Sequence, residues 1–143
     1  MTISPLVLGI DLGTSGVRAV VIDERKEILQ SKATAYRRNL SDPSSWTRAC
    51  QELIQGIPAR LRKNLKAVSV DGTSGTLLAC NHQGVPLGEA LTYSQACPEQ
   101  ERELRRLTPE GGAASSSSGS LARALRLINQ HGPDLLLRHQ ADW

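Results

Sequence analysis

The chain has 143 residues, enough for one ordinary domain with its own core and too few for an enzyme built of two lobes. Apolar residues make up 39% and charged residues 22%, which is typical of a soluble globular protein. A net charge of +3, with two Trp, two Tyr and no Phe, gives no basic surface with interleaved aromatic residues. We therefore predict an aliphatic core and no nucleic-acid partner.

Cysteine usage and the first residues indicate the cellular compartment. Cys50, Cys80 and Cys97 lack the spacing of metal ligands, and their odd number argues against a disulfide framework. Residues 1–10 have no basic start, and Asp11 cuts their apolar run short, so we expect no signal peptide. No apolar segment approaches the ~20 residues that span a bilayer. We predict a cytoplasmic protein with reduced thiols and no membrane partner.

The first part of the chain predicts strands. Residues 6–11 and 17–23 are β-branched and aliphatic and are bounded by glycines. The short connection between them, DLGTSG (11–16), favours an antiparallel pair. Residues 28–36 alternate weakly between apolar and polar and predict a third strand.

An amphipathic helix is expected next. Apolar residues recur three and four positions apart between Trp46 and Ile57. Ser44 or Ser45 is the expected N-cap, and Pro58 ends or kinks the helix.

A second glycine-rich turn, DGTSG (71–75), follows an apolar run at 66–71. Residues 76–80 predict the strand that leaves this turn, and residues 91–94 predict one more short strand. The two turns share a signature, a strand followed by Asp, Gly, Thr, Ser and Gly. We treat this as a local resemblance between turns.

The last third of the chain predicts two helices and a flexible connection. Residues 98–107 form a charged surface helix with acidic residues first and basic residues last, which complements the helix dipole. Residues 108–120 break all periodicity and have the composition of a flexible linker. Another helix follows at 120–132, with Ser120 as its cap and Gly132 as its stop.

The first turn combines groups that phosphoryl transfer needs. The strand end fixes Asp11, while Gly13 and Gly16 let the backbone turn sharply and approach a bulky anion. Thr14 and Ser15 add hydroxyls, and the N–H groups of the turn form an anion nest. Asp11 is repelled by phosphate and instead suits Mg²⁺, held through water, or a substrate hydroxyl.

Three other structures are considered for the first turn: a plain hairpin, a dinucleotide-binding loop and a Walker A loop. A plain structural hairpin with a capped turn fits the same spacing. A dinucleotide site lacks its G-x-G-x-x-G leading into a helix, and a Walker A loop is excluded because there is no G-K-[ST].

The second turn adds weight to a functional site. Asp71, Thr73 and Ser74 again place polar groups at the end of an apolar strand. If both strands belong to one sheet, the two turns open onto one crevice, where ligands of α/β sheets commonly bind. Two unrelated structural turns remain the alternative.

Several motifs together resemble one protein family. DLGTSGVRAVVID resembles the first phosphate motif of the actin-like ATPase superfamily. SVDGTSGTLLAC, LTYSQACP and SSSSGSLARAL follow it in an order similar to the FGGY carbohydrate kinases, most closely their D-ribulose kinase and xylulokinase-like branch. The resemblance covers almost the whole chain, and only the combination of motifs is specific.

The resemblance implies an α/β fold: a ribonuclease H-like, actin-like lobe with a mixed sheet and flanking helices. It also implies that residues 1–143 are the N-terminal part of the first of two lobes, with the rest of that lobe and the second lobe absent. We expect an exposed sheet edge, because parts that would pack on it are missing. The serine-rich segment then becomes an ordered loop on the sugar side.

The resemblance also implies site residues. Asp11 would face Mg²⁺ and the reacting end of the sugar. The remaining implied positions line the phosphate turn (Gly13, Thr14, Ser15) or the sugar side (Thr73, Ser74, Gly75, Gln95). Arg123 stands where relatives often carry Lys. The general base and the adenosine-binding motifs lie outside this chain.

The implied function is ATP-dependent phosphorylation of a ketopentose such as D-ribulose, with ATP and Mg²⁺ as cofactors. The segment alone is expected to be inactive. Two alternatives stay open: a truncated, non-catalytic kinase remnant, and another member of the actin-like superfamily.

Overall fold

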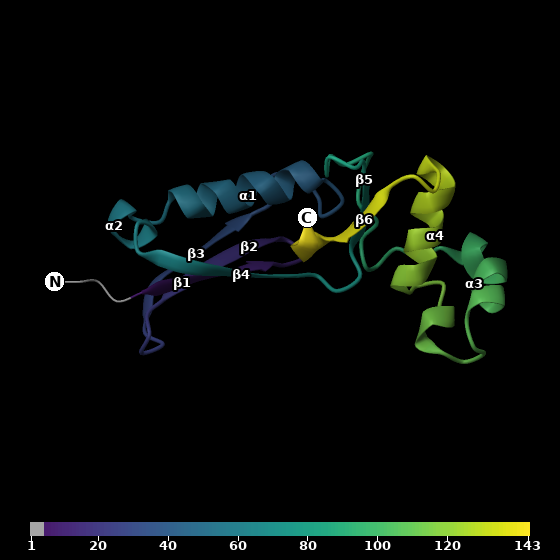
Figure 1. Ribbon diagram of the computed structural model, residues 1–143, viewed down its shortest axis with the longest axis horizontal. Helices are drawn as coiled ribbons and strands as arrows, with labels where there is room; N and C mark the ends of the chain where they lie inside the picture. Colours follow the sequence, from purple (N-terminus) through teal and green to yellow (C-terminus); the bar gives the residue numbers. More distant parts are fainter. Residues whose placement is uncertain (1–4) are drawn as a thin grey trace. The chain divides into compact units, whose positions relative to one another are not determined.

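The computed structural model describes residues 5–143, and the chain divides after Gly72 into two compact units, which we describe one at a time (Figure 1). Residues 1–4 begin the segment in which we predict no signal peptide, and they lie outside the described residues. None of the helices within residues 5–143 is long and apolar enough to cross a membrane.

The first unit is built on a mixed four-stranded sheet in the order β3-β2-β1-β4. β1 (Leu6–Leu12), β2 (Gly16–Ile22) and β3 (Ile28–Ala35) form an antiparallel meander. β4 (Leu65–Gly72) returns parallel to β1. These strands confirm the three strands and the antiparallel pair predicted for the first part of the chain.

The two faces of this sheet differ because successive side chains of a strand point to opposite sides. One face is apolar, and its buried members on β1 and β2 are Leu6, Leu8, Ile10, Leu12, Val17, Ala19 and Val21. The other face of β1 carries Val7, Gly9 and Asp11. The register of β1 therefore places Asp11 outside the core.

The helix α1 (Pro43–Gln55) packs on β2 and β3 of the first unit. Its N-cap is Asp42, whose carboxylate accepts a hydrogen bond from the Ser44 backbone N–H at 2.9 Å. The prediction of Ser44 or Ser45 as cap was wrong, since Pro43 occupies the first helical position, for which its fixed φ is suited. The helix ends before Pro58, and a short helix α2 (Ala59–Arg62) follows.

β4 forms one edge of the sheet, and most of its side chains are exposed. Val68 and Val70 on this strand are 57% and 43% exposed. No strand within residues 5–143 pairs with the outer side of β4. Packing of further parts of the protein on this edge stays a prediction.

The second unit contains a two-stranded antiparallel sheet of β5 (Leu77–Cys80) and β6 (Leu136–His139). β5 confirms the strand predicted after the second turn, whereas β6 was not predicted. The predicted strand at 91–94 was wrong: only Leu91 forms an isolated bridge, and the chain then turns, with the Gln95 N–H donating to the Thr92 carbonyl at 3.0 Å.

Helices form the rest of the second unit. The predicted charged helix begins as a 3-10 turn, η1 (Pro98–Gln100), and continues as α3 (Glu101–Leu107). The last predicted helix is α4 (Ser120–His131). Its N-cap is Gly119 without a side-chain hydrogen bond, so the Ser120 cap was wrong, whereas the stop at Gly132, with φ 85°, is confirmed.

The serine-rich segment is ordered and is not a flexible linker. It contains a 3-10 turn, η2 (Ala113–Ser115), and the Ser117 carbonyl accepts a hydrogen bond from the Cys97 N–H at 2.7 Å. A final 3-10 turn, η3 (Gln140–Asp142), follows β6.

The cysteines are unpaired, as predicted. Cys80 and Cys97 are buried and Cys50 is partly buried, and none of the three forms a disulfide among the described residues. Burial raises the pKa of all three thiols. Cys80 and Cys97 therefore pack as small apolar side chains of the core.

An ion pair between Arg126 on α4 and Glu99 in η1 gives the second unit a contribution to stability that is expected to depend on pH. Arg126 donates to both oxygens of Glu99, at 2.5 and 2.7 Å, and these hydrogen bonds lower the pKa of Glu99 from 4.5 to about 2. Because the folded-state pKa is depressed, the stabilisation is complete above pH 4.5 and is lost as the pH falls towards 2. We expect Glu99→Gln to flatten the pH dependence of the urea midpoint in this window. Glu101→Gln on α3 is the control, and an unchanged pH slope in Glu99→Gln would contradict the assignment.

Candidate phosphate and sugar site

The turn between β1 and β2 is held in place by Tyr36, a residue that was not singled out from the sequence. The Gly13 N–H donates to the Gly16 carbonyl at 2.9 Å and closes the turn. The Tyr36 hydroxyl donates to the Gly13 carbonyl at 3.0 Å, and the Tyr36 N–H donates to the Ser15 carbonyl at 3.0 Å. The exposed hydroxyl-bearing residues Thr14 and Ser15 therefore stand on an anchored backbone.

Gly16 has a structural role that was not predicted from the sequence. A Cβ on Gly16 would lie 2.2 Å from the Thr34 carbonyl oxygen and 2.9 Å from the Ala35 Cα. Both atoms are backbone, so no side-chain movement relieves the overlap. The absence of a side chain at Gly16 therefore allows β2 to lie close to β3. The φ angle of Gly16 is not in the left-handed region that favours glycine.

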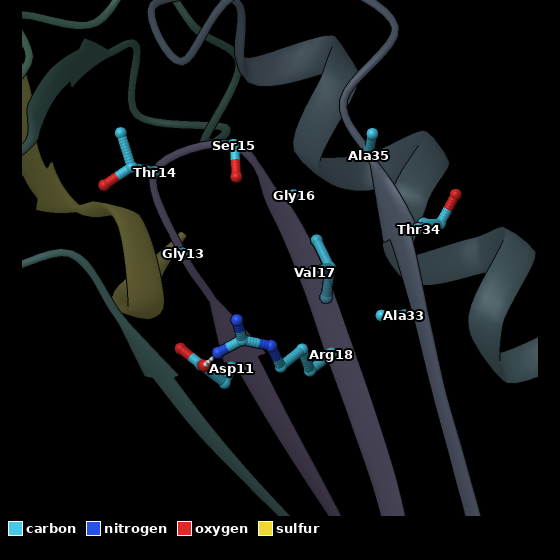
Figure 2. Close-up of a pocket in the computed structure, with 10 residues that line it drawn as sticks. All are labelled: Asp11, Gly13, Thr14, Ser15, Gly16, Val17, Arg18, Ala33, Thr34 and Ala35. Atoms are coloured by element: carbon cyan, nitrogen blue, oxygen red, sulfur yellow. Dashed lines mark hydrogen bonds and ion pairs between the residues drawn. The ribbon is translucent and has the colours of Figure 1, made fainter.

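A cavity of about 540 Å³ lies beside this turn, lined by Asp11, Gly13–Arg18 and Ala33–Ala35 (Figure 2). The Arg18 guanidinium reaches across the strands to Asp11, with 3.5 Å between Nη1 and Oδ2 (Figure 2). The side chains of Arg18 and Asp11 are 75% and 51% exposed, so the pair is a weak surface ion pair. The Arg18 guanidinium is thus a largely solvent-exposed cation at the edge of the cavity.

Arg18 lines the candidate site and was not singled out from the sequence. Its signal is the strand register: Arg18 lies directly opposite Asp11 in the antiparallel β1–β2 pair. Both residues therefore point to the same face of the sheet.

A second carboxylate lies next to Asp11. Asp71 at the end of β4 is the in-register neighbour of Asp11 across the parallel β1–β4 pair. Both residues, with Arg18 and Ser69, line a hollow of about 340 Å³ on this face. Carboxylate oxygens are ligands that Mg²⁺ prefers, but no group of three or more His, Cys, Asp or Glu within residues 5–143 is placed to hold a metal ion. These two carboxylates would therefore hold Mg²⁺ only together with water or with oxygens of a bound phosphate.

The second turn is held by a polar network in the second unit. The Gln140 side-chain carbonyl accepts from the Thr73 N–H at 2.9 Å and from the Thr73 hydroxyl at 2.7 Å. The Thr73 hydroxyl lies 2.7 Å from the Thr76 hydroxyl, which accepts from the Tyr93 N–H at 3.3 Å. The Thr73 hydroxyl is thus engaged inside the unit, while Ser74 is exposed at the tip of the turn.

Gln95 lies in a turn whose conformation it maintains itself. Its side-chain carbonyl accepts from the Thr92 N–H at 2.6 Å, and the residue is exposed. The Gln95 side chain also carries two amide N–H donors, which this bond does not use.

The predicted residues divide between the units. The first unit brings together the groups of the phosphate turn, Asp11, Gly13, Thr14 and Ser15, and the second holds the groups of the sugar side, Thr73, Ser74, Gly75 and Gln95. The strands that lead into the two turns, β1 and β4, are parallel neighbours in one sheet, as the prediction of a shared crevice requires. β5, which leaves the second turn, belongs to the other sheet. A single crevice shared by both turns stays a prediction.

Comparison with known proteins identifies the family. The sequence resemblance implies a mixed sheet with a phosphate-binding turn between its first two strands. The first unit contains a mixed sheet with a tight turn at that position. The model of the N-terminal domain of the FGGY family of carbohydrate kinases matches residues 6–123, and the chain therefore belongs to this family. This decides against the alternative of a different actin-like superfamily member.

Curated relatives include xylulose kinases of two staphylococci. The protein from Staphylococcus epidermidis is 29% identical over 103 residues, covering 64% of this chain and 21% of the relative. The protein from Staphylococcus xylosus is 26% identical over 105 residues, covering 68% and 22%. The chain thus spans about a fifth of the length of the curated relatives that it matches.

Solved structures share the fold. A xylulose kinase from Bifidobacterium adolescentis matches with a TM-score of 0.77 at 18% identity, over 99% of this chain and 33% of that one. Plasmodium falciparum glycerol kinase with ADP matches with a TM-score of 0.72 at 15% identity, over 96% and 33%. The predicted ribonuclease H-like fold is confirmed by these matches.

Proposed function

We propose that the chain is the N-terminal part of the first lobe of an ATP-dependent kinase that phosphorylates a ketopentose such as D-ribulose. The observation that carries the proposal is the anchored Gly13–Gly16 turn, which has a carboxylate and a guanidinium beside one cavity. Family membership supports a carbohydrate acceptor. A cytoplasmic location also belongs to the proposal, in keeping with three unpaired thiols.

The phosphate side of the site would work through charge and position. The N–H groups and hydroxyls around Thr14 and Ser15 would receive the transferred phosphate of ATP, and Arg18 would leave its weak pair with Asp11 to neutralise part of that phosphate's charge. Asp11, with Asp71 beside it, would hold Mg²⁺ through water. The ion supplies neutralisation of the phosphate oxygens when bound.

The sugar side would use the second turn. Ser74 would donate or accept a hydrogen bond at a sugar hydroxyl, with Thr73 and Gly75 shaping the wall and Gln95 offering its amide N–H groups. We assign no general base within this chain. Asp11 is kept for the metal and the sugar's reacting end.

The direct test is a coupled assay of ADP formation with the protein in its natural length. D-ribulose, D-xylulose, glycerol and gluconate are offered in turn with ATP and Mg²⁺. We expect selective turnover of D-ribulose. Turnover of another of these compounds would replace D-ribulose as the proposed substrate. The absence of turnover with all four would favour the non-catalytic remnant.

Replacing Ser74 tests the sugar side. Ser74→Ala removes one exposed hydroxyl from a turn whose backbone is held by other residues, so we expect the fold to be kept. The KM for the sugar should rise up to about tenfold, the effect of losing one neutral hydrogen bond, while the KM for ATP stays the same. Ser44→Ala on α1 is the matched control. An unchanged sugar KM in Ser74→Ala removes Ser74 from the site.

A further inference from the structure

Arg123 on α4 is a buried cation whose hydrogen bonds all go to backbone carbonyls. It is 3% exposed. Its Nε donates to the Gly75 carbonyl at 2.8 Å. Its Nη1 lies 3.1 Å from the carbonyl of Tyr93 and 2.9 Å from those of Gln95 and Ser118.

These four carbonyls come from three segments that are distant in sequence. Gly75 belongs to the second turn, Tyr93 and Gln95 to the 92–95 turn, and Ser118 to the serine-rich loop. The sequence resemblance places these same three segments on the sugar side. One guanidinium thus links the backbone of three segments on the predicted sugar-binding side.

The chemistry of the side chain suits this task. Burial lowers the pKa of Arg123, since removing a cation from water is unfavourable. An apolar side chain would fill this position without that cost. A guanidinium offers five N–H donors in a rigid plane, and it can therefore hold several carbonyls at fixed relative positions.

Gly75 is matched to the guanidinium. Its φ is +80°, and a Cβ there would lie 2.9 Å from Arg123 Nη2 and 3.2 Å from Ser120 Oγ. The turn is therefore held at Gly75 by Arg123 and at Thr73 by Gln140. Ser74 is the exposed residue between these two anchors.

We propose that Arg123 is a positioning residue of the kinase, which sets the second turn, the 92–95 turn and the serine-rich loop in the geometry that receives the sugar. The inference rests on the proposed function, because it concerns the same sugar site. Arg123 acts through the backbone of these segments and need not touch the substrate.

The experiment compares three variants in the protein of natural length. Arg123→Met keeps the apolar stem and removes every donor. Arg123→Lys retains three N–H groups on one atom, so it can serve the carbonyls near Nη1 but not Gly75 at the same time. Arg126→Met, one turn along the same helix, loses only the ion pair with Glu99 and is the matched control.

We expect the KM for the sugar to rise tenfold or more in Arg123→Met, in the range of about 10–100-fold for a misplaced binding group, while the KM for ATP changes less than twofold. Arg123→Lys should be intermediate, and Arg126→Met should keep both KM values. Amide hydrogen exchange at residues 73–76, 93–95 and 117–118 should accelerate in Arg123→Met and not in Arg126→Met.

The measurements distinguish a failure of the role proposed for Arg123 from a failure of the proposed kinase function. A lower melting temperature with an unchanged sugar KM shows that Arg123 is only structural. If Arg123→Met raises the KM for ATP as much as the KM for the sugar, Arg123 has no role specific to the sugar site. If the wild type phosphorylates none of the sugars, the proposed function fails. In that case, faster amide hydrogen exchange in Arg123→Met would still show that Arg123 anchors the three segments. Unchanged amide hydrogen exchange would overturn the anchoring role too.

Discussion

Asp11→Asn is expected to lower kcat at least about hundredfold while leaving the fold intact, because several kcal/mol of charge stabilisation disappears with the carboxylate. Asparagine keeps the size and one carbonyl oxygen of Asp11, but it lacks the charge that would hold Mg²⁺. The side chain is 51% exposed, and its ion pair with Arg18 is a surface contact. Its loss therefore costs under about 1 kcal/mol of stability.

The measurement is kcat at saturating sugar and ATP over a range of Mg²⁺ concentrations, with the urea midpoint of each variant beside it. Asp134→Asn is the control, since Asp134 is an exposed carboxylate of the second unit that pairs with His82. Near-normal kcat in Asp11→Asn, with an unaltered Mg²⁺ dependence, contradicts the role of Asp11.

Gly16→Ala is expected to have the largest effect on stability. The new methyl group would lie 2.2 Å from the Thr34 carbonyl oxygen, and only separation of β2 from β3 makes room for it. We expect a loss of about 2–4 kcal/mol in the free energy of unfolding, as for severe overpacking. The phosphate turn would move with the strand, because Tyr36 follows β3 and holds the turn.

Urea denaturation measures this loss, and Gly9→Ala is the matched control. Gly9 lies on the neighbouring strand β1, and the nearest atom to a Cβ there is 4.0 Å away. Its replacement should change the free energy of unfolding by less than about 1 kcal/mol. Equal effects of the two substitutions would show that the contact between Gly16 and Thr34 is not tight.

The first sheet could be predicted because its strands follow a simple periodicity. Alternation along β1 and β2 sets which residues are buried, and the short DLGTSG connection sets the antiparallel pairing. The same register contains the position of Arg18 opposite Asp11, so this residue was predictable in principle. The Asp42 cap was also predictable, since Pro43 marks the first position of a helix.

Other features depend on tertiary contacts and leave no local signal. β6 has four residues and exists through its pairing with β5, more than fifty residues earlier in the chain. Gln140 directly after it reaches Thr73 only once that pairing has formed. A charged residue on an amphipathic helix is normally solvated, so the burial of Arg123 could not be read from the pattern of α4.

The double attachment of Tyr36 has a consequence for catalysis. Because the hydroxyl and the backbone N–H of this one residue bind the turn at Gly13 and at Ser15, the loop keeps its shape before any nucleotide arrives. In the proposed kinase, ordering of the loop takes place during folding and is not subtracted from the affinity for ATP. A preorganised cradle also needs little rearrangement as charge shifts in the transition state, which is the condition under which fixed dipoles accelerate a reaction most.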